Sequence, residues 1–154
     1  MRAAVLTISS SLSEGRGEDA SGPALAERCE AAGLDTMRET LPDDRRAIAD
    51  ALRRLADEQG VRFVFTTGGT GLTADDVTPE ATRDVLEREA PGYAETIRAE
   101  SREHTPLGIL TRGVSGIRGR TLIVNFPGNP KAIGEGWQVV EPTLLQAAQT
   151  LERE

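Results

Sequence analysis

The stretch TTGGTGLTADDVTPE, residues 66–80, follows the apolar run VRFVF of residues 61–65. The apolar run predicts a buried strand, and Thr78-Pro79 is typical of a helix start. Glycines let backbone N–H groups turn toward a phosphate without interference from a Cβ atom. The adjacent acids Asp75 and Asp76 could hold a divalent cation that neutralises that phosphate. The stretch therefore predicts a strand that delivers a glycine loop to an anionic ligand.

A tight turn without a ligand is the alternative interpretation of residues 68–71, and helix capping is the alternative for Asp75 and Asp76. The loop is neither a Walker loop, because no Gly-Lys-Ser/Thr follows, nor the dinucleotide motif G-x-G-x-x-G. Two acids so close together repel each other unless a cation such as Mg²⁺ lies between them. We therefore favour phosphate or nucleotide binding.

Strand and helix patterns alternate along the 154 residues, which predicts an α/β fold with a mostly parallel sheet covered by helices. Residues 1–154 are expected to form one domain. We expect a loop at residues 10–20, and Leu25, Cys29 and Ala32 on the buried face of the first long helix. The expected strands are residues 2–9, 34–41, 61–66, 114–118 and 120–126, and helices are expected to begin near residues 19–23, 42–44, 79, 93 and 130.

Polar loops follow four of these strands, at residues 9–22, 42–44, 67–76 and 127–131. Ligands of open α/β sheets bind beyond the carboxyl ends of the strands. If the four strands are parallel, the loops converge on one edge of the sheet. The candidate ligand-binding residues at this edge are Ser9, Thr67, Gly68, Gly69, Thr70, Gly71, Asp75, Pro127, Gly128, Asn129 and Lys131.

The last of these loops, residues 127–131, could also be a plain turn between a strand and a helix. Its Gly and Asn can expose N–H groups at a helix start, where an anion is favoured, and Lys131 adds a positive charge. Asp43 and Asp44 have a similar alternative, since acids at a helix start complement its dipole.

Charge, hydropathy and cysteine content exclude several classes of function and location. The net charge of −7 argues against non-specific binding to nucleic acid, and no apolar run is long enough to span a membrane. Residues 1–9 are interpreted as a strand rather than a signal peptide. The single cysteine, Cys29, excludes an internal disulfide and fits a reducing, cytoplasmic location. We expect Cys29 to be a core residue.

Several other side chains receive a structural interpretation. With one cysteine and one histidine, His104, the chain has no basis for a zinc site or a Cys–His nucleophile. His104 is expected at the surface, and Trp137 in the core or at a subunit interface. The arginines at positions 112, 118 and 120 are expected to form a solvated face.

Three segments resemble the MogA/MoaB family of molybdenum cofactor biosynthesis proteins, which includes the G domains of Cnx-type proteins and gephyrin. The segments are residues 66–82, the run GIRGRTLIVNFPGNPK at residues 116–131, and DASGP at residues 19–23. The resemblance covers essentially the whole chain, and its TTGGTG…DVTPE signature is far more specific than a generic glycine loop.

This resemblance implies a three-layer α/β/α fold, a homotrimer and adenylylation of molybdopterin by Mg-ATP, with pyrophosphate as the second product. It implies that Asp76 is the essential acid, that Asp43 is the second functional acid, and that both bind the metal. The glycine loop and residues 127–130 would line the pterin and nucleotide sites. A molybdenum-insertion protein would be a further partner.

The chain departs from the family after the first strand, where relatives often carry Ser-Asp-Arg and a later aromatic residue. Here these positions are Ser9-Ser10-Ser11 and Gly17. Two alternative functions remain. One is a non-catalytic, molybdopterin-binding scaffold of the MoaB type, although some members of that branch have lost the DVTPE acid, which this chain keeps. The other is a CinA-type nucleotide pyrophosphatase, which shares a similar glycine loop.

Overall fold

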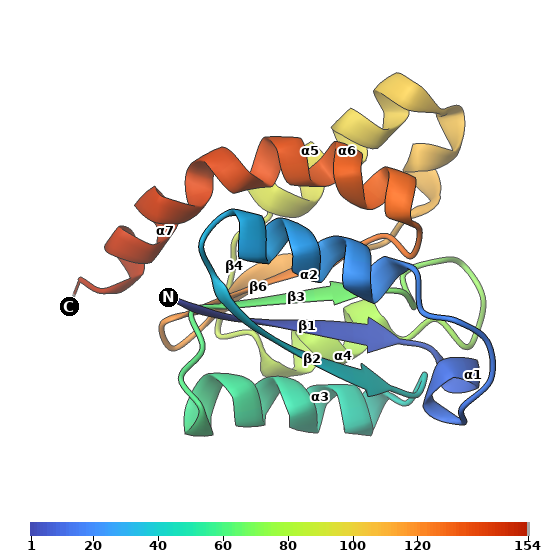
Figure 1. The fold of residues 1–154 in the computed structure, drawn as a ribbon, viewed down its shortest axis with the longest axis horizontal. Helices are drawn as coiled ribbons and strands as arrows, with labels where there is room; N and C mark the ends of the chain where they lie inside the picture. The colour runs from blue at the N-terminus through green and yellow to red at the C-terminus, as the bar shows by residue number, and fades with distance from the viewer. Residues whose placement is uncertain (154) are drawn as a thin grey trace.

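A six-stranded sheet forms the centre of the computed structural model, which describes residues 1–153 (Figure 1). The strand order is β2-β1-β3-β6-β5-β4. The four strands β2, β1, β3 and β6 run parallel, whereas β5 and β4 continue the sheet antiparallel to β6 and β5, respectively. This confirms the predicted α/β class. The strands are β1 (Arg2–Ile8), β2 (Asp35–Leu41), β3 (Phe63–Thr67), β4 (Arg88–Glu89), β5 (Ser115–Arg118) and β6 (Thr121–Phe126).

Helices cover both faces of the sheet, so that the molecule has three layers (Figure 1). One face carries α2 (Ser21–Ala31), α5 (Gly92–His104), α6 (Pro130–Val140) and α7 (Leu144–Leu151), and the other carries α3 (Arg45–Arg53) and α4 (Thr78–Val85). The shorter helical segments are α1 (Ser10–Ser13), η1 (Arg54–Glu58), η2 (Pro106–Leu110) and η3 (Glu141–Thr143). Among residues 1–153, no helix combines the length and apolarity needed to cross a membrane.

Alternation along β3 divides its side chains between the two cores. Phe63 and Phe65 belong to the core under α2, α5 and α6, and Val64 belongs to the core over α3 and α4. The ring of Phe65 packs edge-on against Phe126 and against Trp137, with centroids 5.7 and 5.6 Å away, respectively. Trp137 is therefore a core residue within the chain, which confirms one of the two predicted alternatives.

Two details differ from the sequence expectations. Ala32 is exposed because α2 ends at Ala31, and Leu34 fills the core position beyond the turn at Gly33. The expected loop at residues 10–20 begins with the short helix α1, whose start is capped by the hydroxyl of Ser9, which accepts a hydrogen bond from the Leu12 N–H.

Candidate functional site

The polar loops after β1, β2, β3 and β6 meet at one edge of the sheet, as predicted. Thr67 Oγ1 donates to the carbonyl of Pro127 at 2.8 Å, and Ser21 Oγ donates to the carbonyl of Gly128 at 3.0 Å. The Ser9 N–H donates to the carbonyl of Leu41 at the end of β2. Since the strands are parallel, their carboxyl ends lie together, and the loops form one continuous surface.

Close backbone contacts explain the glycines of the loop. Gly68 has a φ of +99°, and a Cβ atom there would lie 2.4 Å from the carbonyl oxygen of Ile8. Gly128 lies on the other side, where an added Cβ would be 3.3 Å from the Cα of Gly68. A Cβ atom at position 68 would prevent this close approach, and one at position 128 would require a small shift of Gly68. Residues 8, 68 and 128 thus lie at the centre of the candidate site.

Asp43 and Asp44 have different roles. The Asp44 carboxylate accepts a hydrogen bond from the Ala47 N–H at 3.0 Å and caps α3. Asp43 instead forms a reciprocal pair with Ser10, whose N–H donates to Asp43 Oδ2 at 3.1 Å while the Asp43 N–H donates to Ser10 Oγ at 3.0 Å. The other carboxylate oxygen of Asp43 would lie 3.2 Å from a Cβ atom on Gly69. Asp43 therefore lies against the glycine loop.

Asp76 folds back on its own loop. Its Oδ2 accepts hydrogen bonds from the N–H and the hydroxyl of Thr73, at 3.1 and 2.9 Å. The side chain is half-buried, whereas Asp75 is exposed. Helix α4 begins after Val77 without a side-chain cap, so neither acid caps this helix by a hydrogen bond. The capping interpretation of the acid pair therefore finds no support in the hydrogen bonds of α4.

Arg112 binds this loop from outside, so the interpretation of Arg112 as part of a solvated face was wrong. Its guanidinium donates to the carbonyl oxygens of Gly71 and Asp76 and pairs with the Glu80 carboxylate. The hydrogen bond between Arg112 and Glu80 is the largest cause that lowers the pKa of Glu80 and raises that of Arg112. Arg118 is also engaged, with Asp57 and the carbonyl of Val85.

Sequence reasoning missed Arg112 because its partners are more than thirty residues away. No local pattern marks such a pairing. The available signal was that three arginines follow closely after one another in a strongly acidic chain.

Two cavities border the converging loops and divide the predicted residues between them. A cavity of about 440 Å³ lies beside α1 and includes Ser9, Thr67, Gly68 and Gly128 in its lining. A smaller cavity of about 200 Å³ includes Pro127, Asn129 and Lys131. His104 also lines the smaller cavity, at the surface between Glu100 and Glu135, as predicted for a surface residue.

Asn129 and Thr70, like Ser9 and Thr67, use their side chains in structural hydrogen bonds. Asn129 caps α6, because its Oδ1 accepts a hydrogen bond from the Ala132 N–H at 2.8 Å. Thr70 is buried, and its hydroxyl lies 3.2 Å from that of Thr111. Lys131 is exposed in the first turn of α6.

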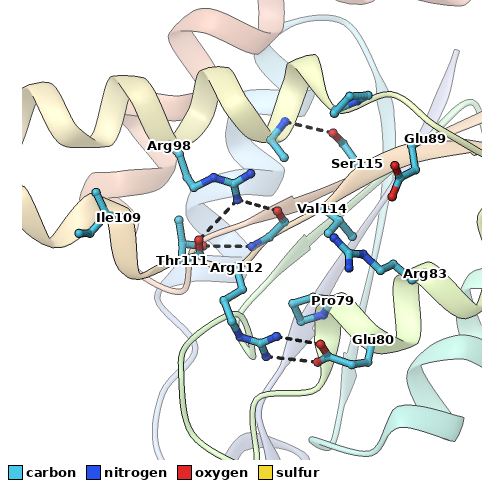
Figure 2. Close-up of a pocket in the computed structure, with 13 residues that line it drawn as sticks. Pro79, Glu80, Arg83, Glu89, Arg98, Ile109, Thr111, Arg112, Val114 and Ser115 are labelled. Atoms are coloured by element: carbon cyan, nitrogen blue, oxygen red, sulfur yellow. Dashed lines mark hydrogen bonds and ion pairs between the residues drawn. The ribbon is translucent and has the colours of Figure 1, made fainter.

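A further cavity, of about 460 Å³, lies between α4, α5 and residues 111–115 (Figure 2). Arg98 and Arg112 lie along one side of this cavity, and its lining includes no residue of the glycine loop. Arg98 is held by the carbonyl of Gly113, to which its Nη1 donates at 2.7 Å. No sequence pattern indicated this cavity.

The acids at the site suit a cation shared with a phosphate ligand. Across residues 1–153, no group of three or more His, Cys, Asp or Glu side chains is arranged to hold a metal ion. Mg²⁺ commonly uses one or two protein carboxylates together with substrate phosphate oxygens and water. Asp43 and Asp76 are of the residue type that this second mode uses, and the loops that carry them follow β2 and β3 at the same edge of the sheet.

Residues 4–146 match the family described as "Probable molybdopterin binding domain". Molybdopterin adenylyltransferase from Helicobacter pylori J99 is 39% identical over 143 residues, covering 91% of this chain and 81% of the relative. The Drosophila melanogaster molybdenum cofactor synthesis protein cinnamon is 40% identical over 145 residues, covering 93% of this chain and 24% of cinnamon. The chain thus spans about a quarter of that longer relative.

The chain also resembles solved structures of molybdopterin biosynthesis proteins. The molybdopterin biosynthesis enzyme MoaB from Thermus thermophilus superposes with a TM-score of 0.91 at 40% identity, covering 97% of this chain and 95% of that one. The protein CinA from Thermoplasma acidophilum superposes with a TM-score of 0.67 at 19% identity, covering 93% and 97% of the two chains, which shows a shared fold only.

Proposed function

Since this chain belongs to the molybdopterin-binding domain family, we propose that it is a molybdopterin adenylyltransferase of molybdenum cofactor biosynthesis. In this reaction a terminal phosphate oxygen of molybdopterin forms a bond to the α-phosphorus of ATP. The bond from that phosphorus to the bridging oxygen breaks, and pyrophosphate leaves with the electron pair. The products are adenylyl-molybdopterin and pyrophosphate.

The chain's residues suit a reaction that needs no protein nucleophile, because the substrate phosphate supplies the attacking oxygen. The protein has to hold two polyanions in line and stabilise the charge that develops. Backbone N–H groups of residues 68–71 and 128–129 would bind the phosphates, and preorganised donors of this kind contribute about 3–4 kcal/mol each to lowering a barrier. The absence of a Cys–His or zinc centre in the sequence agrees with this chemistry.

We propose Asp43 and Asp76 as the residues that hold Mg²⁺ and act in catalysis. When bound, Mg²⁺ would neutralise charge on the phosphates of ATP. The observation that supports the role of Asp43 is that its Oδ1 faces the glycine loop, where it would lie 3.2 Å from a Cβ atom added at Gly69. Ser10 keeps the second oxygen of Asp43 in place from the adjoining loop.

The same assignment extends to the substrate contacts. We propose that one substrate binds in the 440 Å³ cavity, where it contacts Ser9, Thr67, Gly68 and Gly128. We propose that the smaller cavity also binds substrate, through Pro127, Asn129 and Lys131 in its lining. The other proposed ligand-binding residues, through the loop backbone or an exposed side chain, are Gly69, Thr70, Gly71 and Asp75.

The remaining family properties are proposals as well. We propose a cytoplasmic homotrimer in which residues 1–154 form one domain, with a molybdenum-insertion protein as a later partner. Light scattering tests the trimer, and a monomeric mass at micromolar protein would exclude it.

The direct test combines the protein with molybdopterin, ATP and Mg²⁺ and follows adenylyl-molybdopterin by chromatography. Asp76→Ala is expected to abolish the product while leaving the fold and molybdopterin binding intact. Asp43→Asn should also lose activity, whereas Asp44→Ala, which removes only the cap of α3, should cost about 1 kcal/mol of stability and keep the activity. Normal turnover by Asp76→Ala would show that its assigned role is wrong.

Two further measurements separate the alternative functions. Calorimetric titration with Mg-ATP would show no nucleotide binding if the protein were a non-catalytic scaffold. Hydrolysis of ADP-ribose would instead point to a CinA-type pyrophosphatase.

A further inference from the structure

Arg112 joins both ends of the loop that carries the acid pair. Its Nε donates to the carbonyl oxygen of Gly71 and its Nη2 donates to the carbonyl oxygen of Asp76, both at 2.7 Å. Its backbone N–H donates to the carbonyl of Thr70 at 2.8 Å. One residue therefore fixes the beginning and the end of residues 71–76 relative to each other.

Glu80 holds the guanidinium in this position. Its two carboxylate oxygens accept from Nη1 at 2.7 Å and from Nη2 at 3.2 Å, so the pair is bidentate (Figure 2). Both side chains are about one-third exposed. A bidentate Arg–carboxylate pair fixes the orientation of the guanidinium plane, which a lysine could not reproduce. Glu80 lies in the first turn of α4, so this helix and the loop before it are connected through Arg112.

The loop needs such an external support. Residues 72–75 are exposed, and the Asp76 carboxylate bonds only to Thr73 among the side-chain hydrogen bonds described for it in residues 1–153. Exposed loop backbone with few buried contacts opens easily. The bond from Arg112 to the Asp76 carbonyl therefore acts on the residue whose carboxylate the proposed reaction needs.

We propose that Arg112 is a positioning residue for adenylyl transfer, which holds the backbone of Asp76 so that its carboxylate meets the cation and the phosphates in a fixed geometry. Glu80 has the supporting role of orienting the guanidinium. This inference rests on the proposed function. Arg112 itself is not assigned any contact with substrate or metal.

Arg112→Met tests the proposal, because methionine keeps much of the side-chain length and removes all five donors. Hydrogen–deuterium exchange of the peptide spanning residues 71–77 should become faster in the variant without any ligand present. The Mg²⁺ concentration for half-maximal activity should rise, and kcat should fall, by about 10- to 100-fold, as is typical when a group that orients a metal ligand is lost. The KM for molybdopterin should change less than about 3-fold, because uniform binding is retained.

Arg118→Met is the matched control. Arg118 grips the Asp57 carboxylate through two nitrogens, at 3.0 and 2.8 Å, and donates to the carbonyl of Val85 at 2.9 Å. The interactions of Arg118 resemble those of Arg112. They lie at the C-terminal ends of α4 and β5, however, and so away from the glycine loop. The control variant should lose comparable thermal stability and keep both the exchange of residues 71–77 and the Mg²⁺ dependence.

Each outcome decides the proposal. Unchanged exchange and unchanged Mg²⁺ dependence in Arg112→Met would overturn it, as would equal effects in Arg118→Met. If Arg112→Met fails to fold, Glu80→Gln replaces it, and faster exchange of residues 71–77 in that variant supports the proposal while wild-type exchange overturns it. If the wild-type protein makes no adenylate, the proposed function fails, and the ligand-free exchange comparison then shows whether the loop support exists without an adenylyl-transfer role.

Discussion

Gly68→Ala is expected to damage catalysis more than stability. The new Cβ would lie 2.4 Å from the carbonyl oxygen of Ile8, and real Cβ atoms essentially never come within 3.0 Å of such a neighbour. Ile8 is held at the end of β1, since it pairs with Leu41 of β2 and follows Thr7, which pairs with Thr67 of β3. The glycine loop therefore has to move by at least about 0.6 Å. Since a misplacement of about 1 Å can cost about 100-fold in rate, we expect kcat to fall about 10- to 100-fold.

Gly33→Ala is the matched control, because it introduces the same kind of backbone strain without displacing the glycine loop. Gly33 has a φ of +87°, close to that of Gly68, but an added Cβ would meet nothing within 4 Å. Both variants carry the penalty of a non-glycine residue at positive φ, about 1–2 kcal/mol. Urea denaturation should show this loss in both, whereas steady-state adenylyl transfer should fall only in Gly68→Ala. Equal activity of the two variants would refute the close-approach argument.

Three further predictions concern the accessibility of Cys29, the stability of the fold at low pH and the requirement for Mg²⁺. Burial raises the pKa of the Cys29 thiol to about 12, so a maleimide should label Cys29 only after unfolding, and rapid labelling of the folded protein would contradict this. The hydrogen bond from Arg112 lowers the pKa of Glu80. The pair therefore stabilises the fold above about pH 4.5 and loses this contribution as the pH falls through the lowered pKa. In thermal melts between about pH 5 and 3, the melting temperature of Glu80→Gln should decline less steeply than that of the wild type. EDTA should stop adenylyl transfer and Mg²⁺ should restore it, while activity that persists in EDTA would exclude the proposed role of Asp43 and Asp76.

The sequence determined those parts of the molecule that depend on neighbouring residues. The apolar run at residues 61–65 specified β3, and Thr78-Pro79 specified the start of α4. The glycines at 68 and 69 predicted a tight loop, and the structure gives them positive φ values of +99° and +68°. Periodicity, caps and glycine conformation act within a few residues along the chain, so they can be read without knowing the fold.

The tertiary structure alone decided which polar residues act together. Only the family resemblance separated Asp43 from Asp44 in the sequence, whereas in the structure the reciprocal bonds to Ser10 and the cap of α3 give each acid a separate place. Arg112 was interpreted as part of a solvated face, and only the fold brings it to Glu80, thirty-two residues away in the sequence. Such pairings depend on how strands are ordered in the sheet and helices packed on it, and contacts between distant segments leave no periodic trace in the sequence that contains them.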